Sequence, residues 1–160
     1  MSDLPETARP RLYLDVDGVI IAEASPFETA SLLYLSEKYA PEIIRRLGNT
    51  CMDLVWLTTR ENQAIELAES VDGLRGGRVL SLDRSSRSSP VTWKLRALLS
   101  DQAGSPSPFV WVDDHITPEA RREVAERLSV PKLVVQTDGN TGLNEPQLAS
   151  IEQFAKTYVN

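Results

Sequence analysis

Short apolar runs alternate with helical patterns along this chain of 160 residues. The apolar runs fall at residues 11–16, 53–57, 78–82, 109–112 and 132–136, and each has the length of a buried strand. Helical periodicity or helix-start signals separate and follow them, at residues 29–47, 62–70, 90–99, 118–128 and 146–158. This alternation predicts an α/β domain in which a five-stranded parallel sheet carries helices on both faces.

The bulk composition fits one domain with a core of its own. Hydrophobic residues make up 41% of the chain and charged residues 25%, which is ordinary for a soluble globular protein. Residues 1–9 are expected to form a flexible tail, followed by a single domain over residues 10–160. No secretory signal is evident and no apolar run reaches about 18 residues, so no membrane partner is expected. The lone Cys51 is compatible with a reducing cytoplasm, where we expect the protein to reside.

Polar side chains follow three of the five predicted strands. They are Asp15 and Asp17 after the first strand, where Gly18 lets the backbone turn away, Thr58 and Thr59 after the second, and Asp113 and Asp114 after the fourth. Ligands bind beyond the carboxyl ends of parallel strands, so we expect these groups to share one site with Lys94, which begins the helix after the third strand. Converging carboxylates repel one another, and a hard cation such as Mg²⁺ relieves that repulsion.

The same groups suit a phosphate. The Thr58 hydroxyl and the backbone N–H groups of the turn after it can bind phosphate oxygens, and Lys94 can neutralise phosphate charge. Phosphoryl transfer requires this positioning and charge neutralisation. Each residue alone has an ordinary interpretation, since Thr58 is typical of a strand end and Asp113-Asp114 of a loop with a helix cap. Only the joint pattern favours a phosphoryl-transfer site.

Four motifs in order resemble those of the haloacid dehalogenase (HAD) superfamily: Asp15-Val-Asp17-Gly18-Val19, Leu54-Val-Trp-Leu57-Thr58, Lys94 and Trp111-Val-Asp113-Asp114. Within the superfamily, the chain is similar to HAD-like domains associated with RNA repair. The resemblance implies a three-layer Rossmann-like fold and a phosphatase that hydrolyses phosphate monoesters.

The resemblance also implies roles for individual residues. Asp15 would be the nucleophile that forms an aspartyl-phosphate, and Asp17 the general acid and base, with a backbone carbonyl that reaches the metal. Thr58, Thr59 and Lys94 would hold the phosphoryl group. Asp15, Asp17 and either Asp113 or Asp114 would bind Mg²⁺, and the sequence does not choose between the last two.

The spacing of the motifs leaves no room for a cap domain, so the site is expected to be open. Three hypotheses follow: a phosphatase acting on a small molecule or phosphoprotein, a polynucleotide phosphatase that processes nucleic-acid ends, and a non-catalytic module that binds or regulates. Arg84, Arg87 and Lys94 near the site favour the second, and the net charge of −6 argues against a broadly basic surface. His115 and residues 137–142 are expected near the rim, with no assigned role.

Overall fold

The computed structural model describes residues 9–20, 41–70, 77–85 and 87–159. Most of the expected tail, the segment after Ile20 and the first half of the helical pattern at 29–47 lie outside these residues. Among the described helices, none is long and apolar enough to cross a membrane.

One parallel sheet forms the centre of the fold. Its strands are β1 (Arg11–Leu14), β2 (Asp53–Trp56), β3 (Arg78–Val79), β4 (Phe109–Asp113) and β5 (Lys132–Gln136). They lie in the order β3-β2-β1-β4-β5, and every pairing between neighbours is parallel. β1 is therefore the middle strand, with Leu14 in register with Trp56 on one side and Val112 on the other. The predicted five-stranded parallel sheet is confirmed.

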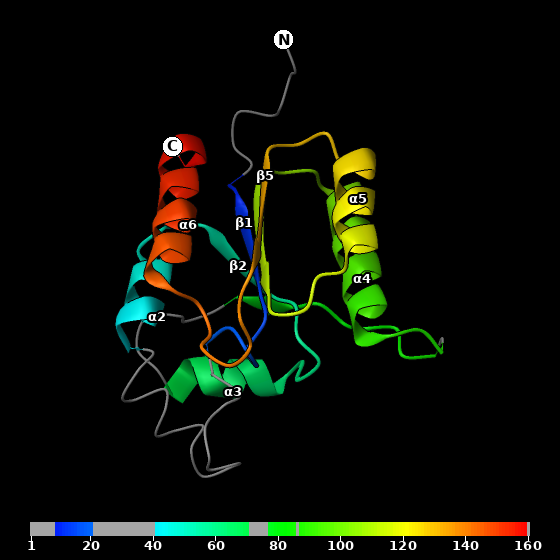
Figure 1. Ribbon diagram of the computed structural model, residues 1–160, viewed down its shortest axis with the longest axis horizontal. Helices are drawn as coiled ribbons and strands as arrows, with labels where there is room; N and C mark the ends of the chain where they lie inside the picture. The colour runs from blue at the N-terminus through cyan, green and yellow to red at the C-terminus, as the bar shows by residue number, and fades with distance from the viewer. Residues whose placement is uncertain (1–8, 21–40, 71–76, 86, 160) are drawn as a thin grey trace.

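Five helices are described: α2 (Pro41–Gly48), α3 (Gln63–Ser70), α4 (Pro90–Gly104), α5 (Pro118–Arg127) and α6 (Glu145–Tyr158). Figure 1 shows α2 and α6 on one side of the sheet and α4 and α5 on the other. The described residues thus form the three layers expected of a Rossmann-like fold, and they contain no second sheet.

The apolar runs are continuous because both faces of the sheet are covered. Successive side chains of a strand point to opposite faces. In β1, Leu12 and Leu14 pack in the core under α2 and α6, whereas Tyr13 packs in the core under α4 and α5. In β4, Val112 and Trp111 divide between the two cores in the same way.

Most described elements end within two residues of the prediction, but β3 and α4 differ by three residues or more. β3 has two residues rather than the five predicted, because β2 ends at Trp56 and offers the edge strand only a short partner. α4 runs to Gly104 rather than ending at Leu99. Its last turn is held by the buried Gln102, which donates to the Tyr13 hydroxyl at 3.0 Å and accepts from the backbone N–H of Ser107 at 3.0 Å. Such tertiary contacts are invisible to local periodicity.

Candidate active site

The turn after β1 places Asp15 at the middle of the sheet's carboxyl end. The Asp15 backbone N–H donates to the Val112 carbonyl at 3.1 Å, and one Asp15 carboxylate oxygen accepts from the Val16 N–H at 2.8 Å. The strand order reverses beside β1, which is where ligands bind in open α/β sheets. Gly18 has a φ of +74°, a left-handed conformation that glycine adopts without steric cost. A Cβ at Gly18 would lie 2.3 Å from Oδ2 of Asp114, so the glycine also makes room for that carboxylate.

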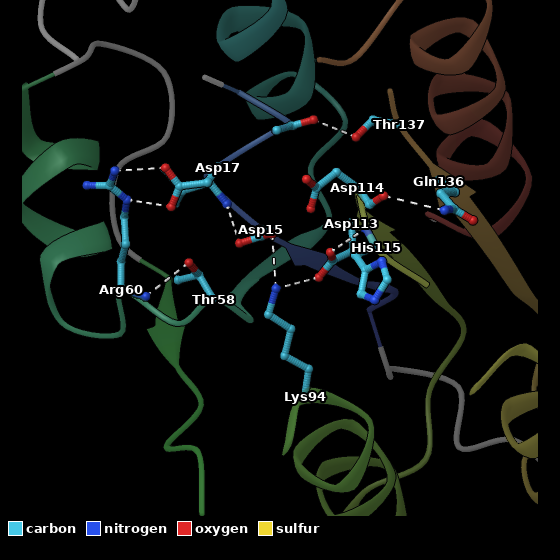
Figure 2. A network of polar contacts seen from close by, with 12 residues as sticks. Asp15, Asp17, Thr58, Arg60, Lys94, Asp113, Asp114, His115, Gln136 and Thr137 are labelled. Carbon is cyan, nitrogen blue, oxygen red and sulfur yellow. Dashed lines mark hydrogen bonds and ion pairs between the residues drawn. The ribbon is translucent and has the colours of Figure 1, made fainter. Parts of the chain in front are cut away.

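Lys94 lies between two buried carboxylates, as Figure 2 shows. Its Nζ is 3.0 Å from Oδ2 of Asp15 and 2.7 Å from Oδ2 of Asp113, and the three side chains are at most 8% exposed. Lys94 reaches this position because α4 begins at Pro90, directly beside the carboxyl ends of the strands. One ammonium group therefore serves two carboxylates.

Asp15, Lys94 and Asp113 are buried together, and the single charge of Lys94 does not balance two carboxylates. Their pKa values reflect this imbalance. Burial raises the pKa of Asp15, although Lys94 opposes the effect. Burial, and after it the charge of Asp15, raises the pKa of Asp113 to about 7. For Lys94, burial acts to lower the pKa, but the two carboxylates outweigh it and the pKa is raised. A further cation would stabilise the fully ionised carboxylates.

Three carboxylates can meet around such a cation. One oxygen each from Asp15, Asp113 and Asp114 lies within 4.8 Å of the others. Both oxygens of Asp113 are already bonded, Oδ2 to Lys94 and Oδ1 to the backbone N–H of His115 at 3.0 Å. The half-buried Asp114 side chain has no hydrogen-bond partner among the described residues. Hard oxygen donors of this kind suit Mg²⁺, so the residues fit the predicted metal.

Asp17 does not join this group through its side chain. Its carboxylate is paired with Arg60 in a two-point contact, Oδ2 to Nε at 2.7 Å and Oδ1 to Nη2 at 2.8 Å. Sequence reasoning gave Arg60 no role. The available signal was its place two residues after Thr58, where a long cationic side chain can reach the end of the neighbouring strand. Fork-shaped pairing with a carboxylate is specific to arginine and fixes the orientation of both groups.

The predicted phosphate-binding residues lie at the same end of the sheet. Thr58 is fully buried, accepts from the Arg60 backbone N–H at 3.2 Å, and acts through its hydroxyl to lower the pKa of Asp15. Thr59 is exposed and lines a pocket of 210 Å³ together with Asp15, Asp17, Lys94, Asp113, Asp114 and His115. Six of the seven predicted site residues thus line one pocket, and Thr58 lies beneath it.

The loop after β5 supports the turn that carries the two aspartates. The buried Thr137 donates through its hydroxyl to the Gly18 carbonyl at 2.6 Å and through its N–H to the Asp113 carbonyl at 3.1 Å. The Leu143 N–H donates to the Val19 carbonyl at 2.9 Å. This loop was expected only at the rim. It instead connects the ends of β1 and β4 that hold the carboxylates.

The parallel sheet, with carboxylates at the ends of β1 and β4 and a lysine between them, defines a HAD-like domain. The family model described as "HAD domain in Swiss Army Knife RNA repair proteins" matches residues 11–148, which include every site residue described above. The chain belongs to this family, and the resemblance seen in the sequence is confirmed. No curated protein and no solved structure matches the chain.

Proposed function

We propose that this domain is a Mg²⁺-dependent phosphatase that hydrolyses phosphate monoesters through an aspartyl-phosphate on Asp15. The observation that carries the proposal is the buried Asp15 carboxylate, which lies beside Lys94 and two further carboxylates at the switch point of the sheet. A carboxylate oxygen of Asp15 attacks phosphorus, and the bond from phosphorus to the leaving oxygen breaks. Water then attacks the aspartyl-phosphate, which releases inorganic phosphate and restores Asp15.

The neighbours of Asp15 prepare it for this step. The Val16 N–H and Lys94 each bind one of its oxygens and so fix the plane of the carboxylate. Lys94 also places positive charge where the phosphoryl group would arrive. Positioning and charge neutralisation are the main demands of phosphoryl transfer.

Asp17 is proposed to move the proton, first to the leaving group and then from water. In the described conformation Arg60 binds both of its oxygens. A proton donor must face its acceptor at hydrogen-bond distance. Asp17 therefore has to release at least one contact with Arg60 during the reaction.

Asp15 and Asp114 are the proposed Mg²⁺ ligands, with Asp113 beside them and the Asp17 backbone carbonyl as a further ligand. The Asp114 oxygens are the better placed of the pair, because both Asp113 oxygens already accept hydrogen bonds. When bound, the ion supplies positive charge that offsets carboxylate repulsion and neutralises phosphate oxygens.

The test is hydrolysis of p-nitrophenyl phosphate with Mg²⁺ and with a chelator. Asp15→Asn should lower kcat by about a thousandfold or more, since the nucleophile is lost. Asp53→Asn is the matched control, because this exposed aspartate lies at the opposite end of β2. Equal activity of wild type and Asp15→Asn would refute the assignment, as would activity that does not depend on the metal.

A polynucleotide phosphatase is the second candidate, and the family's description in RNA repair proteins favours it. The exposed Arg84 donates to the Thr59 carbonyl at 2.6 Å, which places a guanidinium at the rim of the pocket. Terminally phosphorylated oligonucleotides, phosphopeptides and sugar phosphates compared at equal concentration would separate this candidate from a small-molecule or phosphoprotein phosphatase. No turnover of any ester would favour the third hypothesis, a non-catalytic module.

A further inference from the structure

A groove of 710 Å³ lies between one face of α4 and the edge of the sheet at β3. One wall is a single face of α4, since its lining residues recur at helical spacing: Trp93, Arg96, Ala97, Ser100, Asp101 and Gly104. Arg78, Leu80 and Asp83, in and after the edge strand β3, line the other wall, and Arg11 of β1 also contributes. From Trp93 to Gly104 the helix rises about 16 Å. That length accommodates several stacked nucleotides at about 3.4 Å each.

The groove carries more positive than negative charge in a chain whose net charge is −6. Its lining includes the guanidinium groups of Arg11, Arg78 and Arg96 and the carboxylates of Asp83 and Asp101. Asp101 accepts from Arg11 at 3.2 Å and from Arg78 at 2.6 and 2.8 Å, so two guanidinium groups share one carboxylate. These contacts hold the cations in place, and the Arg78 side chain remains 49% exposed.

One end of the groove adjoins the catalytic pocket. Trp93 lines the groove, and the next residue, Lys94, contacts Asp15. Arg84 lies between the two sites, with its guanidinium 5.7 Å from the centre of the Trp93 ring. The same guanidinium donates to the carbonyl of Thr59, which lines the catalytic pocket. A chain that leaves the catalytic pocket beside Thr59 therefore meets an arginine and then a tryptophan.

We propose that this groove binds the single-stranded nucleic acid that leads to the terminal phosphate. The inference rests on the proposed function, because it assumes that Asp15 hydrolyses that phosphate. Bases stack on aromatic side chains, and stacking tolerates any sequence. Guanidinium groups attract phosphate, so Arg96 on the exposed face of α4 and Arg78 on the opposite wall place positive charge beside the backbone of a bound strand. The combination of an indole at the catalytic end and cations along the groove fits a polynucleotide better than a phosphopeptide.

Binding is tested with fluorescence anisotropy on a 3′-hydroxyl single-stranded RNA of about 12 nucleotides. The RNA carries a hydroxyl group at its 5′ end as well, so it has no phosphate monoester to hydrolyse and its binding is independent of catalysis. Arg96→Glu and Ser100→Glu, both on the exposed face of α4, should each raise Kd by about tenfold. Arg96→Glu should also reduce the salt slope by about one. Lys156→Glu is the control, because this exposed residue lies on α6 across the sheet and its replacement changes the net charge as much as Arg96→Glu.

The same variants are then assayed on p-nitrophenyl phosphate and on the RNA carrying a terminal phosphate. The proposal expects Arg96→Glu to leave p-nitrophenyl phosphate hydrolysis unchanged and to lower kcat/KM for the oligonucleotide by about tenfold. DNA of the same sequence should show the same loss. A wild type that hydrolyses p-nitrophenyl phosphate but binds no oligonucleotide overturns the groove and leaves the proposed function standing. Groove-dependent RNA binding without hydrolysis of any ester overturns the proposed function alone. The groove is also overturned if Lys156→Glu loses as much RNA affinity as Arg96→Glu. It is overturned as well if Arg96→Glu lowers kcat/KM for a phosphopeptide and not for the oligonucleotide.

Discussion

Replacing Gly18 with alanine tests how the turn after β1 shapes the carboxylate cluster. The left-handed φ of +74° costs an alanine about 1–2 kcal/mol. The new methyl group would also lie 2.3, 2.5 and 2.8 Å from three atoms of the Asp114 side chain. Ordinary contacts begin near 3.4 Å, so the carboxylate has to move by about 1 Å.

That displacement should affect activity more than stability. A shift of about 1 Å in a group that positions reacting atoms can lower the rate about a hundredfold. We therefore expect Gly18→Ala to lose about 1–2 kcal/mol of unfolding free energy, to lose about a hundredfold in kcat/KM, and to need more Mg²⁺ for half-maximal activity. Urea denaturation measures the first effect, and p-nitrophenyl phosphate hydrolysis over a range of Mg²⁺ concentrations measures the other two.

Gly77→Ala is the matched control. Gly77 also has a positive φ, +82°, and a Cβ there would lie 3.1 Å from a side-chain carbon of Leu54. Gly77 precedes β3 and lies at the opposite end of the sheet from the carboxylates. It should show the stability loss without the change in activity or Mg²⁺ dependence. Wild-type activity and Mg²⁺ dependence in Gly18→Ala would refute the reasoning, as would an equal activity loss in Gly77→Ala.

Three further predictions concern groups around the site and the core. Lys94→Met leaves Asp15 and Asp113 buried without their cation and should destabilise the protein by about 3–5 kcal/mol, measured by urea denaturation without metal. Mg²⁺ should restore part of this stability. If Mg²⁺ has no effect on stability, the metal assignment is contradicted. Tyr13 is buried, and burial together with the hydrogen bond to Asp101 raises its pKa to about 12 from 10.0. The folded state therefore keeps a proton that the unfolded state loses, so stability should fall by about 2–3 kcal/mol between those two pKa values as pH rises. Tyr13→Phe should remove this loss of stability at alkaline pH, measured by urea denaturation at a series of pH values. If the loss persists in Tyr13→Phe, another group causes it. Thr137→Val removes the hydroxyl that donates to the Gly18 carbonyl and should cost about 1–3 kcal/mol, with a larger fractional loss in kcat than Ser150→Ala, a control on the exposed side of α6.

Much of the fold follows from the sequence because both faces of the sheet are covered. Two-sided burial demands continuous apolar runs, and these mark the strands clearly. The strand order does not follow in the same way, since β1 and β4 pair through contacts that no local pattern records. The short β3 has the same cause, because its length is set by its partner β2.

The site divides along a similar line. Asp15, Asp113 and Asp114 could be placed together from sequence because parallel strands bring their carboxyl ends to one edge. The pairing of Asp17 with Arg60 could not be predicted from sequence, because it depends on where the turn after β2 directs a long side chain. The support that Thr137 gives to Gly18 is a contact between distant loops and carries no local signal. The sequence therefore brings the candidate site residues together, and only the structure shows what holds them.

The central place of β1 has a consequence for how the chain reaches its native state. β1 pairs with β2 and with β4, and α2, β2, α3, β3 and α4 all lie between β1 and β4 in the chain. Closing that long loop delays the β1–β4 pairing, and until then an apolar strand presents an open edge to other chains. Newly synthesised protein is thus most exposed to aggregation before β4 emerges. Refolding yield should accordingly fall as protein concentration rises, and the carboxylate cluster should assemble only in the final stage of folding.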